Sequence, residues 1–362
     1  MNGVQKVYVL GAGAMGSLVA NEMATLHGSL VDMILLLKTK RRLDEFRNAN
    51  SRILVSRRSG LESISSISEI NADYRSPTKA SGQPMYIQNL ILSTKTHNTV
   101  PALQKYVPNL DSKSNILILQ NGMGMKEKLV ETFWPDEQYR PNMFQAISTH
   151  GAYKSSPNEI HHVGMGRISI ARIPRLLRPE VDTSEADSTP QFIRMLLACE
   201  TLRAEYVLYD SLLLRQIEKL IVNACINPLT ALFDCPNGDL FYGVKTVPLM
   251  KKIINEAVRV FKGEFDVFDK VPEANSQLNS HQLLDTVLAI CELTAQNSSS
   301  MREDVRNLNT TEIDWINGYI VSLGYKHGIP TPVNKLFVSM IKNKLSIEKT
   351  LDARSINNQL RN

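Results

Sequence analysis

The sequence predicts an α/β fold in two domains: a first domain built on a parallel sheet with helices on both faces, and then an all-helical domain. Short apolar runs alternate with helical patterns through the first half of the chain, which is typical of such a sheet. A glycine-rich turn follows the first apolar run, and from about Ser211 onward only helical patterns remain. We therefore expect domains at residues 1–208 and 209–362.

In the first domain, apolar runs predict strands at Lys6–Leu10, Asp32–Leu37, Ile87–Ser93, Asn115–Gln120 and Asn142–Ser148. The segments between them predict helices at Met15–Leu26, Lys40–Asn48, Asn98–Tyr106 and Met125–Phe133. The domain is completed by an extended segment at His162–Arg172, an exposed polar loop at 174–190, a helix at Gln191–Glu200 and a strand at Ala204–Leu208. In the second domain we expect helices at Leu212–Phe233, Val247–Phe261, His281–Ala295, Thr310–His327 and Asn334–Leu345.

The composition is that of a soluble globular protein, with 43% hydrophobic and 21% charged residues. No apolar run is long enough for a transmembrane helix, and because the first strand pattern begins so early we expect no leader peptide. The four cysteines form no CxxC pair, so we expect reduced thiols in the cytoplasm and no metal site. The net charge of +5 is only weak evidence for nucleic-acid binding, which we do not expect. The sequence does not define the oligomeric state, although the helical domain can offer a face for a homodimer.

The glycine-rich turn is Gly11-Ala12-Gly13-Ala14-Met15-Gly16, a G-x-G-x-x-G pattern between a strand and a helix. In this position Gly11 allows the tight turn, Gly13 lets the backbone approach a pyrophosphate, and Gly16 lets helix and strand pack closely. The helix N-terminus then offers N–H donors to the phosphates. The sequence thus predicts a Rossmann-type dinucleotide-binding domain; the alternative is a glycine turn that binds nothing.

The end of the second strand indicates which dinucleotide is bound. An NAD site usually has an acidic residue there for the ribose hydroxyls. This chain instead has Lys38-Thr39-Lys40-Arg41-Arg42, and the first acid is Asp44. Cations suit a 2′-phosphate, so we expect NADP(H), with Lys38 and Arg41 as its candidate contacts. The alternative is a solvated basic start of a helix.

Polar residues also follow two later strands, at Ser93-Thr94-Lys95-Thr96 and at Gln120-Asn121-Gly122-Met123-Gly124. Open α/β sheets bind ligands at the carboxyl ends of their strands, but each segment is also compatible with a plain turn. Thr149-His150 ends the fifth strand in a similar way, and a single histidine there is more often structural than catalytic.

An apolar helix pattern in the second domain carries Lys219, Asn223 and Asn227 at i, i+4 and i+8, and so on nearly one face. Polar groups on such a face need partners. A lysine whose pKa burial lowers toward neutrality can donate a proton to a carbonyl oxygen that gains negative charge. The alternatives are a salt bridge between Lys219 and Glu312 and asparagines that only pack helices.

These residues together resemble the ketopantoate reductase (2-dehydropantoate 2-reductase) family over nearly the whole chain. The resemblance rests on GAGAMG, Lys95, QNGMG, and three more specific segments: Lys219–Leu240, Ser298–Val305 and Thr311–Pro332. The longer loop at 174–190 is similar to fungal-type members. After Lys95 the chain has Thr96-His97-Asn98, which departs from the aromatic dipeptide of some members.

The resemblance implies hydride transfer from NADPH to ketopantoate, a 2-oxo acid, which gives pantoate for coenzyme A synthesis. It makes Lys219 the proton donor and Glu312 the glutamate beside substrate and cofactor. The implied substrate-binding residues are Asn223, Asn227, Asn237 and Ser300. The implied cofactor contacts, besides the residues of the glycine turn and Lys38, are Lys95, Asn121, Ala152 and Glu312.

Two other functions stay open. One is reduction of a different 2-oxo acid, since an apolar pocket distinguishes one methyl by only about 1–3 kcal/mol. The other is a non-catalytic relative that acts as an RNA- or ribosome-associated regulator. Such a protein need not retain the lysine, the glutamate, the asparagines and the serine together.

Overall fold

The computed structural model of the chain describes residues 3–59, 62–175 and 189–359. The chain divides into two compact units. Unit 1 consists of Met1–Gln120 and Lys126–Leu212, and unit 2 of Asn121–Met125 and Leu213–Asn362. Most of the expected loop at 174–190 falls on residues 176–188, which lie outside the described residues.

Unit 1 contains an eight-stranded sheet with the strand order β12-β11-β8-β7-β6-β1-β2-β5. The bounds are β1 Gln5–Leu10, β2 Val31–Leu36, β5 Asn71–Asp73, β6 Asn89–Leu92, β7 Asn115–Leu119, β8 Asn142–Ser148, β11 Ile168–Arg172 and β12 Ala204–Tyr206. All neighbouring strands run parallel except β8 and β11, which are antiparallel. The expected α/β class with a largely parallel sheet is confirmed.

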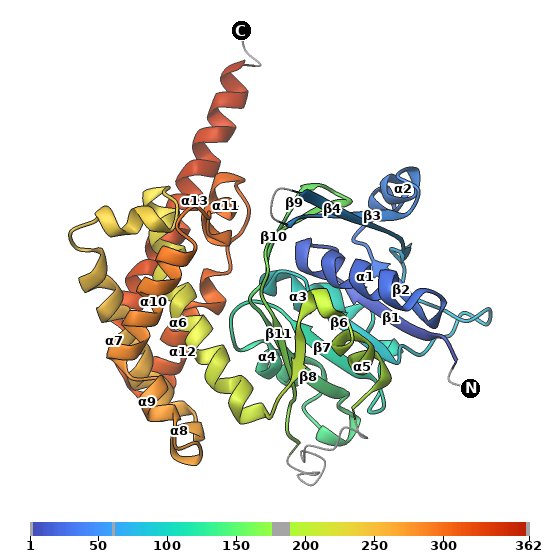
Figure 1. Cartoon of the computed structure of the whole chain (residues 1–362), viewed down its shortest axis with the longest axis horizontal. Helices are drawn as coiled ribbons and strands as arrows, with labels where there is room; N and C mark the ends of the chain where they lie inside the picture. Colours follow the sequence, from blue (N-terminus) through green and yellow to red (C-terminus); the bar gives the residue numbers. More distant parts are fainter. Residues whose placement is uncertain (1–2, 60–61, 176–188, 360–362) are drawn as a thin grey trace. The chain divides into compact units, whose positions relative to one another are not determined.

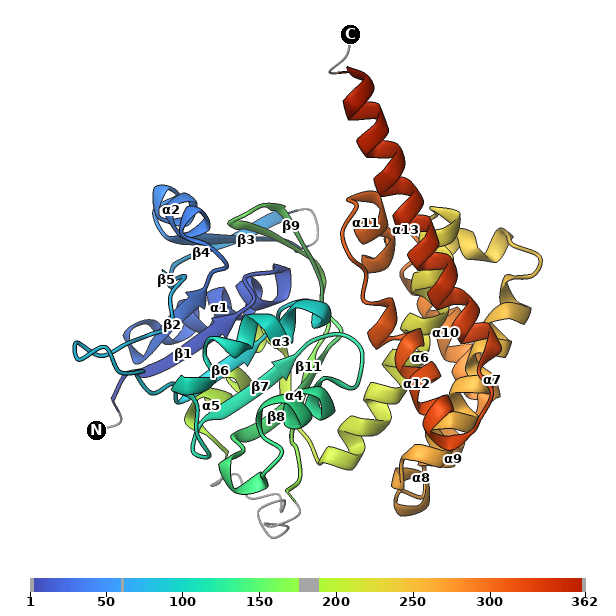
Figure 2. The same ribbon diagram turned by 180° about the vertical axis from the view of Figure 1, so that it is seen from behind.

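Helices cover both faces of this sheet. They are α1 Ala14–His27, α2 Lys40–Asn48, α3 Thr96–Gln104, α4 Met125–Phe133 and α5 Gln191–Leu197, with short 3-10 turns at Gly28–Leu30, Val107–Asn109, Glu137–Tyr139 and Glu200–Leu202. Helices α1 and α5 lie on the face seen in Figure 1, and α3 and α4 lie on the face seen in Figure 2. Apolar residues of α1 such as Leu18, Val19 and Met23 are fully buried against the strands.

Unit 1 also contains a second sheet, which the sequence analysis did not predict. Its four strands are β3 Arg52–Ser59, β4 Glu62–Glu69, β9 Gly151–Ser156 and β10 Glu159–Gly164, in the order β4-β3-β10-β9. The extended segment expected at His162–Arg172 is present as two strands, because its first residues belong to β10 of this sheet and Ile168–Arg172 form β11 of the larger one. Buried Asn21 of α1 ties this sheet to the helix, since its Nδ2 donates to the Ile53 carbonyl at 2.9 Å.

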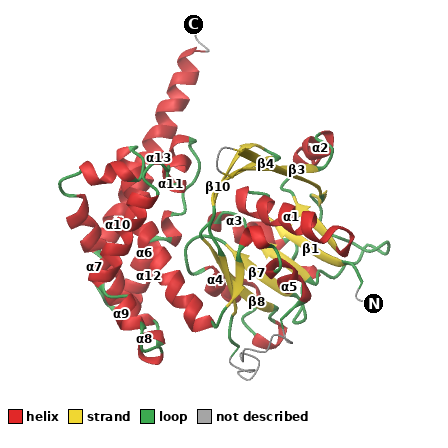
Figure 3. Ribbon diagram, viewed as in Figure 1, coloured by secondary structure: helices red, strands yellow, loops and turns green. Residues whose placement is uncertain are grey.

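Unit 2 contains helices and connecting loops, and none of its described residues forms a strand (Figure 3). The α-helices are α6 Tyr209–Phe233, α7 Thr246–Glu264, α8 Val267–Lys270, α9 Ala274–Gln277, α10 Ser280–Leu293, α11 Ser300–Arg306, α12 Asn317–His327 and α13 Pro332–Gln359. Two 3-10 turns lie at Gly238–Tyr242 (η7) and Ile313–Trp315 (η8). The helix expected at Thr310–His327 is wrong over its first seven residues, because the backbone turns at Ile316 and α12 begins at Asn317.

A buried polar network holds the helices of unit 2 together. Glu256 of α7 accepts hydrogen bonds from the Val333 and Asn334 N–H groups, at 2.9 and 3.0 Å, at the start of α13. Asn317 Nδ2 of α12 donates to Asn334 Oδ1 and to the Ala224 carbonyl of α6, each at 3.0 Å. These bonds satisfy groups that would otherwise be costly to bury, and they fix α6 relative to α12 and α13.

No helix in the described part of the chain is both long and apolar enough to cross a membrane.

Candidate functional site

Packing within unit 1 explains two glycines of the glycine-rich turn. Gly11 has φ +117°, and a Cβ there would lie 2.3 Å from the Thr94 nitrogen. A Cβ on Gly16 would lie 2.2 Å from both the Gly11 carbonyl oxygen and Ser93 Oγ. Ser93 Oγ donates to that same carbonyl at 2.7 Å. The turn is therefore locked against the end of β6, the neighbouring strand.

Packing does not explain Gly13. A Cβ there would meet the Ser93 carbonyl oxygen at 3.9 Å, an ordinary contact. Gly13 caps α1 with an extended backbone, no side chain caps the helix, and no acid stands in its first turn. Among the described residues, no side chain accepts a hydrogen bond from the N–H groups of this turn, which includes Ala14 and Met15, and the missing Cβ leaves room beside them. This arrangement fits the phosphates of a dinucleotide.

The basic segment after β2 forms the start of α2. Thr39 caps the helix, since its Oγ1 accepts a hydrogen bond from the Arg42 N–H at 3.2 Å. Lys38 is exposed. Arg41 is 89% exposed and forms a pair with Glu45 at 3.0 Å, a contact of little energy at such a surface. Both candidate 2′-phosphate contacts thus lie at the carboxyl end of the second strand, where solutes can reach them.

The ends of β6 and β7 are joined by side-chain hydrogen bonds. Gln120 Nε2 donates to the Thr94 carbonyl at 2.5 Å and to Thr99 Oγ1 at 2.6 Å. Lys95 caps α3 and is exposed. Ala152 lies on β9 and packs on the core of unit 1. The predicted cofactor contacts of unit 1 therefore come from the glycine turn, the starts of α2 and α3, and the second sheet.

His150 has structural partners. Its Nε2 lies 2.9 Å from the Leu202 carbonyl, and its Nδ1 accepts from the Gly166 N–H and lies 3.0 Å from His162 Nε2. Burial, together with the neighbouring His150 and Arg57, lowers the pKa of His162 to about 4. This neutral buried pair fits the structural alternative raised for the end of the fifth strand.

In unit 2, Lys219 of α6 contacts the asparagine of the QNGMG turn. Its Nζ donates to Asn121 Oδ1 at 3.0 Å. Burial lowers the pKa of Lys219 to about 8, and the negative charge of Glu312 opposes that shift. An ammonium with such a pKa is protonated at neutral pH and can release its proton readily, as a general acid requires.

The turn that carries Asn121 packs inside the helical unit. Gly122 has φ +80° and Gly124 has φ +93°, and a Cβ on Gly122 would lie 2.5 Å from the Trp315 carbonyl oxygen. The Met123 N–H donates to that oxygen at 3.0 Å. Only glycine permits so close an approach with this backbone. The η8 turn thereby holds Asn121 at α6.

Glu312 is the capping residue of η8 and is buried. The helix expected at Thr310–His327 would place Glu312 in its first turn, which is wrong, because the 3-10 turn Ile313–Trp315 intervenes before α12. The consequence for the site is favourable: the same short turn carries both Glu312 and the residue that holds the Asn121 turn.

The asparagine positions differ in their partners. Asn223 is half-buried on α6 and Asn227 is buried one turn further along. Asn237 Nδ2 donates to Thr294 Oγ1 at 2.9 Å, whereas its buried Oδ1 has no hydrogen-bond partner among the described residues. A buried unpaired oxygen is costly, so Asn237 fits a position that a ligand donor completes.

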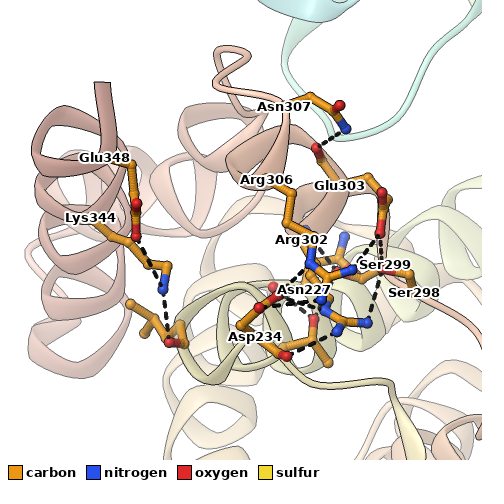
Figure 4. Close-up of polar contacts among 12 residues, drawn as sticks. Asn227, Asp234, Ser298, Ser299, Arg302, Glu303, Arg306, Asn307, Lys344 and Glu348 are labelled. Carbon is orange, nitrogen blue, oxygen red and sulfur yellow. Dashed lines mark hydrogen bonds and ion pairs between the residues drawn. The ribbon is translucent and has the colours of Figure 1, made fainter. Parts of the chain in front are cut away.

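An ionic network ties α11 to the end of α6 (Figure 4). Asp234 accepts from Arg302 Nε at 3.0 Å and from Arg306 Nε at 2.6 Å. The hydrogen bond from Arg306 is the main cause that lowers the pKa of Asp234 to about 2. Ser299 caps α11, and its Oγ accepts from Thr230 Oγ1 of α6 at 2.7 Å. The network thus fixes Ser300, the exposed first residue of α11, relative to α6.

The structure gathers the predicted site residues in two sets, one in each unit. Sequence reasoning missed Lys154 of β9, whose Nζ donates to the Ala12 carbonyl of the glycine turn. A single lysine in a polar strand carries no periodic signal that distinguishes it from a surface residue. Among the described residues no group of three or more His, Cys, Asp or Glu could hold a metal ion.

Comparisons with known proteins identify relatives that match nearly the whole chain. The family model "Ketopantoate reductase PanE/ApbA" matches residues 7–175, and "Ketopantoate reductase PanE/ApbA C terminal" matches residues 211–345. A probable 2-dehydropantoate 2-reductase of Schizosaccharomyces pombe is 37% identical over 349 residues, which cover 95% of this chain and 97% of that protein. The 2-dehydropantoate 2-reductase of Saccharomyces cerevisiae is 28% identical over 378 residues, covering 98% and 97%.

Two further matches bear on fold and on function. The crystal structure of a probable 2-dehydropantoate 2-reductase from Bacillus subtilis aligns with a TM-score of 0.67 at 25% identity, over 94% of this chain and 99% of that one. A cytochrome b translational activator of Saccharomyces cerevisiae is 25% identical over 378 residues, covering 96% and 97%.

Proposed function

The chain belongs to the ketopantoate reductase family, and we infer from this that it is an NADP-dependent oxidoreductase that reduces ketopantoate to pantoate. The assignment of the reacting groups rests on the environment of Lys219. Its Nζ donates to Asn121 Oδ1, burial lowers its pKa, and the negative charge of Glu312 opposes that shift. The residue roles that follow are proposals.

The residues that would hold NADP(H) in unit 1 are the glycine turn, the start of α2 with Lys38 and Arg41, Lys95 and Ala152. The open space at Gly13 and the absence of an acid at the tip of β2 support this part of the proposal. When bound, NADPH supplies the hydride. Asn121 and Glu312 of unit 2 complete the proposed cofactor contacts.

Lys219 acts as the general acid. A hydride added to the keto carbon leaves an electron pair on the carbonyl oxygen, and the Lys219 ammonium gives that oxygen its proton. Asn121 keeps Nζ oriented through its Oδ1, and Glu312 keeps enough negative charge nearby for the lysine to stay protonated at neutral pH. The neutral lysine formed in this step is protonated again from solvent.

Asn223, Asn227, Asn237 and Ser300 bind the substrate. Neutral donors can hold the carboxylate and hydroxyl of ketopantoate without a cation that would compete with Lys219. The unpaired Oδ1 of Asn237 suits the substrate hydroxyl, which is a donor.

The two predicted domains keep their proposed roles, with residues 1–208 for NADP(H) and 209–362 for substrate and catalysis. A cytoplasmic location is likewise a proposal, supported by four cysteines that are all free thiols. Cell fractionation with an antibody to the chain tests it.

Two alternative functions can be tested by experiment. An assay of NADPH oxidation across a panel of 2-oxo acids that includes ketopantoate distinguishes reduction of another 2-oxo acid from reduction of ketopantoate. A regulatory role like that of the translational activator predicts no turnover with any of them. The lowered pKa of Lys219 favours the enzyme, because a binding protein has no need for a labile proton there.

The decisive experiment measures NADPH oxidation at 340 nm for the wild type, Lys219→Ala and the control Lys252→Ala, an exposed lysine of α7. We expect Lys219→Ala to lower kcat by about 10²- to 10⁴-fold while the affinity for NADPH stays within about threefold, because only the proton donor is lost. Lys252→Ala should match the wild type. A loss below about tenfold in Lys219→Ala would show that another group delivers the proton.

A further inference from the structure

Lys154 joins the glycine turn to the basic segment of unit 1. It lies on β9, and its Nζ donates to the Ala12 carbonyl and, at 2.7 Å, to the Pro157 carbonyl. Arg42 of α2 reaches the same Pro157 carbonyl with Nη2 at 2.9 Å. One carbonyl oxygen thus receives donors from two cations that are 112 residues apart in the chain (154 minus 42).

The charges around Lys154 leave it without a counter-ion. Both acceptors of its Nζ are uncharged backbone carbonyls, and in the described part of the chain no carboxylate forms an ion pair with it. Arg42 is already paired with Glu45 at 3.3 Å. Other charged or titratable groups on the neighbouring elements include Glu22 and His27 of α1, Arg52 and Arg57 of β3, Glu159, His161 and His162 of β10, and Lys40, Arg41, Asp44 and Arg47 of α2.

Four of these groups are engaged in pairs with one another. Glu22 is paired with Arg57, and Glu159 lies 3.7 Å from the His161 Nε2. Burial, with a further contribution from the Arg42 charge, lowers the pKa of Lys154 to about 8. A half-buried ammonium next to a guanidinium is destabilised unless an anion compensates it.

We propose that Lys154 is a further binding residue for the 2′-phosphate of NADPH and contributes to the preference for NADPH over NADH. This inference rests on the proposed function. A phosphate accepts hydrogen bonds from an ammonium far better than a peptide carbonyl does. An ammonium has three donors, so Lys154 can keep a contact to the turn while it serves the phosphate. Lys154 contacts the glycine turn directly and shares the Pro157 carbonyl with Arg42 of α2, so it lies beside both elements that bind the phosphates and the adenosine ribose of a dinucleotide in such a sheet.

A purely structural role makes a different prediction. If Lys154 only fixed the Ala12 carbonyl, its loss would loosen the turn for every dinucleotide, and NADPH and NADH would weaken together. A contact to the pyrophosphate would also affect both, since both cofactors contain it. Only a contact to the 2′-phosphate separates the two.

The test measures dissociation constants of NADPH and NADH by fluorescence titration, without substrate, for the wild type, Lys154→Met, Lys154→Arg and the control Lys113→Met. Lys113 is an exposed lysine before β7. We expect Lys154→Met to weaken NADPH by about 10- to 100-fold and NADH by less than about threefold. Lys154→Arg should recover most of the NADPH affinity, and Lys113→Met should leave both constants unchanged. Equal weakening of both cofactors, or no weakening of NADPH, overturns the proposal.

The pH dependence of binding gives a second measurement. Because a phosphate stabilises the charged lysine, the wild type should lose affinity for NADPH relative to NADH above pH about 8, by up to tenfold per pH unit. Lys154→Arg should abolish this loss, since arginine does not titrate there. A wild type with no preference for NADPH would contradict the proposed cofactor. A wild type that prefers NADPH, with Lys154→Met unaffected, would contradict only this inference.

Discussion

Asn121→Asp should move the alkaline limb of the pH profile of kcat/KM to higher pH. In the wild type the rate depends on protonated Lys219, whose pKa is about 8. The value of kcat/KM for ketopantoate should therefore be level around neutral pH and fall tenfold per unit above about 8. The substitution replaces the neutral Oδ1, 3.0 Å from Nζ, with a carboxylate oxygen of nearly the same shape.

The size of the shift follows from this distance. Two unit charges 3.0 Å apart interact by about 1.4 kcal/mol even at the dielectric constant of water. Since one pKa unit corresponds to about 1.4 kcal/mol, the pKa of Lys219 should rise by at least about one unit, to about 9 or above. The ratio of kcat/KM at pH 10 to that at pH 7 should then be about 0.01 in the wild type and about 0.1 in the variant.

Stopped-flow or steady-state NADPH oxidation across pH 6 to 10.5, at saturating NADPH, provides the profile. Asn121→Ala serves as the matched control, because it removes an acceptor of the ammonium and should lower the pKa of Lys219 instead. The reasoning is refuted if the limb stays in place in Asn121→Asp, or if both variants shift in the same direction.

Three further predictions concern the fold and its site. Gly13→Ala should keep the thermal stability of the wild type but bind NADPH at least about tenfold more weakly. Gly16→Ala should fail to fold or lose several degrees in Tm, because its Cβ would lie 2.2 Å from the Gly11 carbonyl oxygen. Equal effects of the two substitutions on stability would contradict this distinction. Asp234→Ala should lower the free energy of unfolding in urea by about 1–3 kcal/mol, because buried Arg302 loses its carboxylate partner, and should raise KM for ketopantoate more than KM for NADPH; an unchanged KM for ketopantoate would reduce the network to a stabilising role. The pKa of His162 is about 4 in the folded chain and 6.5 in the unfolded one, so the folded chain loses stability as the pH falls from 6.5 toward 4. In His162→Gln the free energy of unfolding in urea should fall by about 1–3 kcal/mol less between pH 7 and pH 4.5 than in the wild type. An equal fall in the two proteins would refute this.

Strands with continuous apolar residues could be placed from the sequence closely. The segment Asn142–Ser148 is buried along nearly its whole length and matches the predicted strand. The second sheet could not be found in this way. Strand β4 has the sequence ESISSISE, and of its residues 64–69 only Ser68 is buried, so periodicity does not separate the strand from a polar loop.

Turn geometry explains the errors in unit 2. The segment from Thr310 to Ile316 continues the helical spacing of α12, but the backbone turns at Ile316 and a 3-10 turn replaces the first part of the expected helix. Among the site residues, those set by local spacing could be predicted and those set by long-range contacts could not. The stripe of Lys219, Asn223 and Asn227 could be predicted because it repeats every four residues on one helix, whereas Lys154 depends on a contact across 142 residues.

The five residues Asn121–Met125 have a consequence for how this chain can be divided. They are separated from the rest of their compact unit by 87 residues of sequence (126 to 212), yet the Met123 N–H bonds to Trp315 and Asn121 bonds to Lys219. A fragment that begins at residue 213 would lack Asn121 and with it the hydrogen bond that Lys219 Nζ donates to Asn121 Oδ1. Chimaeras between relatives should accordingly exchange this pentapeptide together with the C-terminal half, because the two segments form one compact unit despite their distance in the sequence.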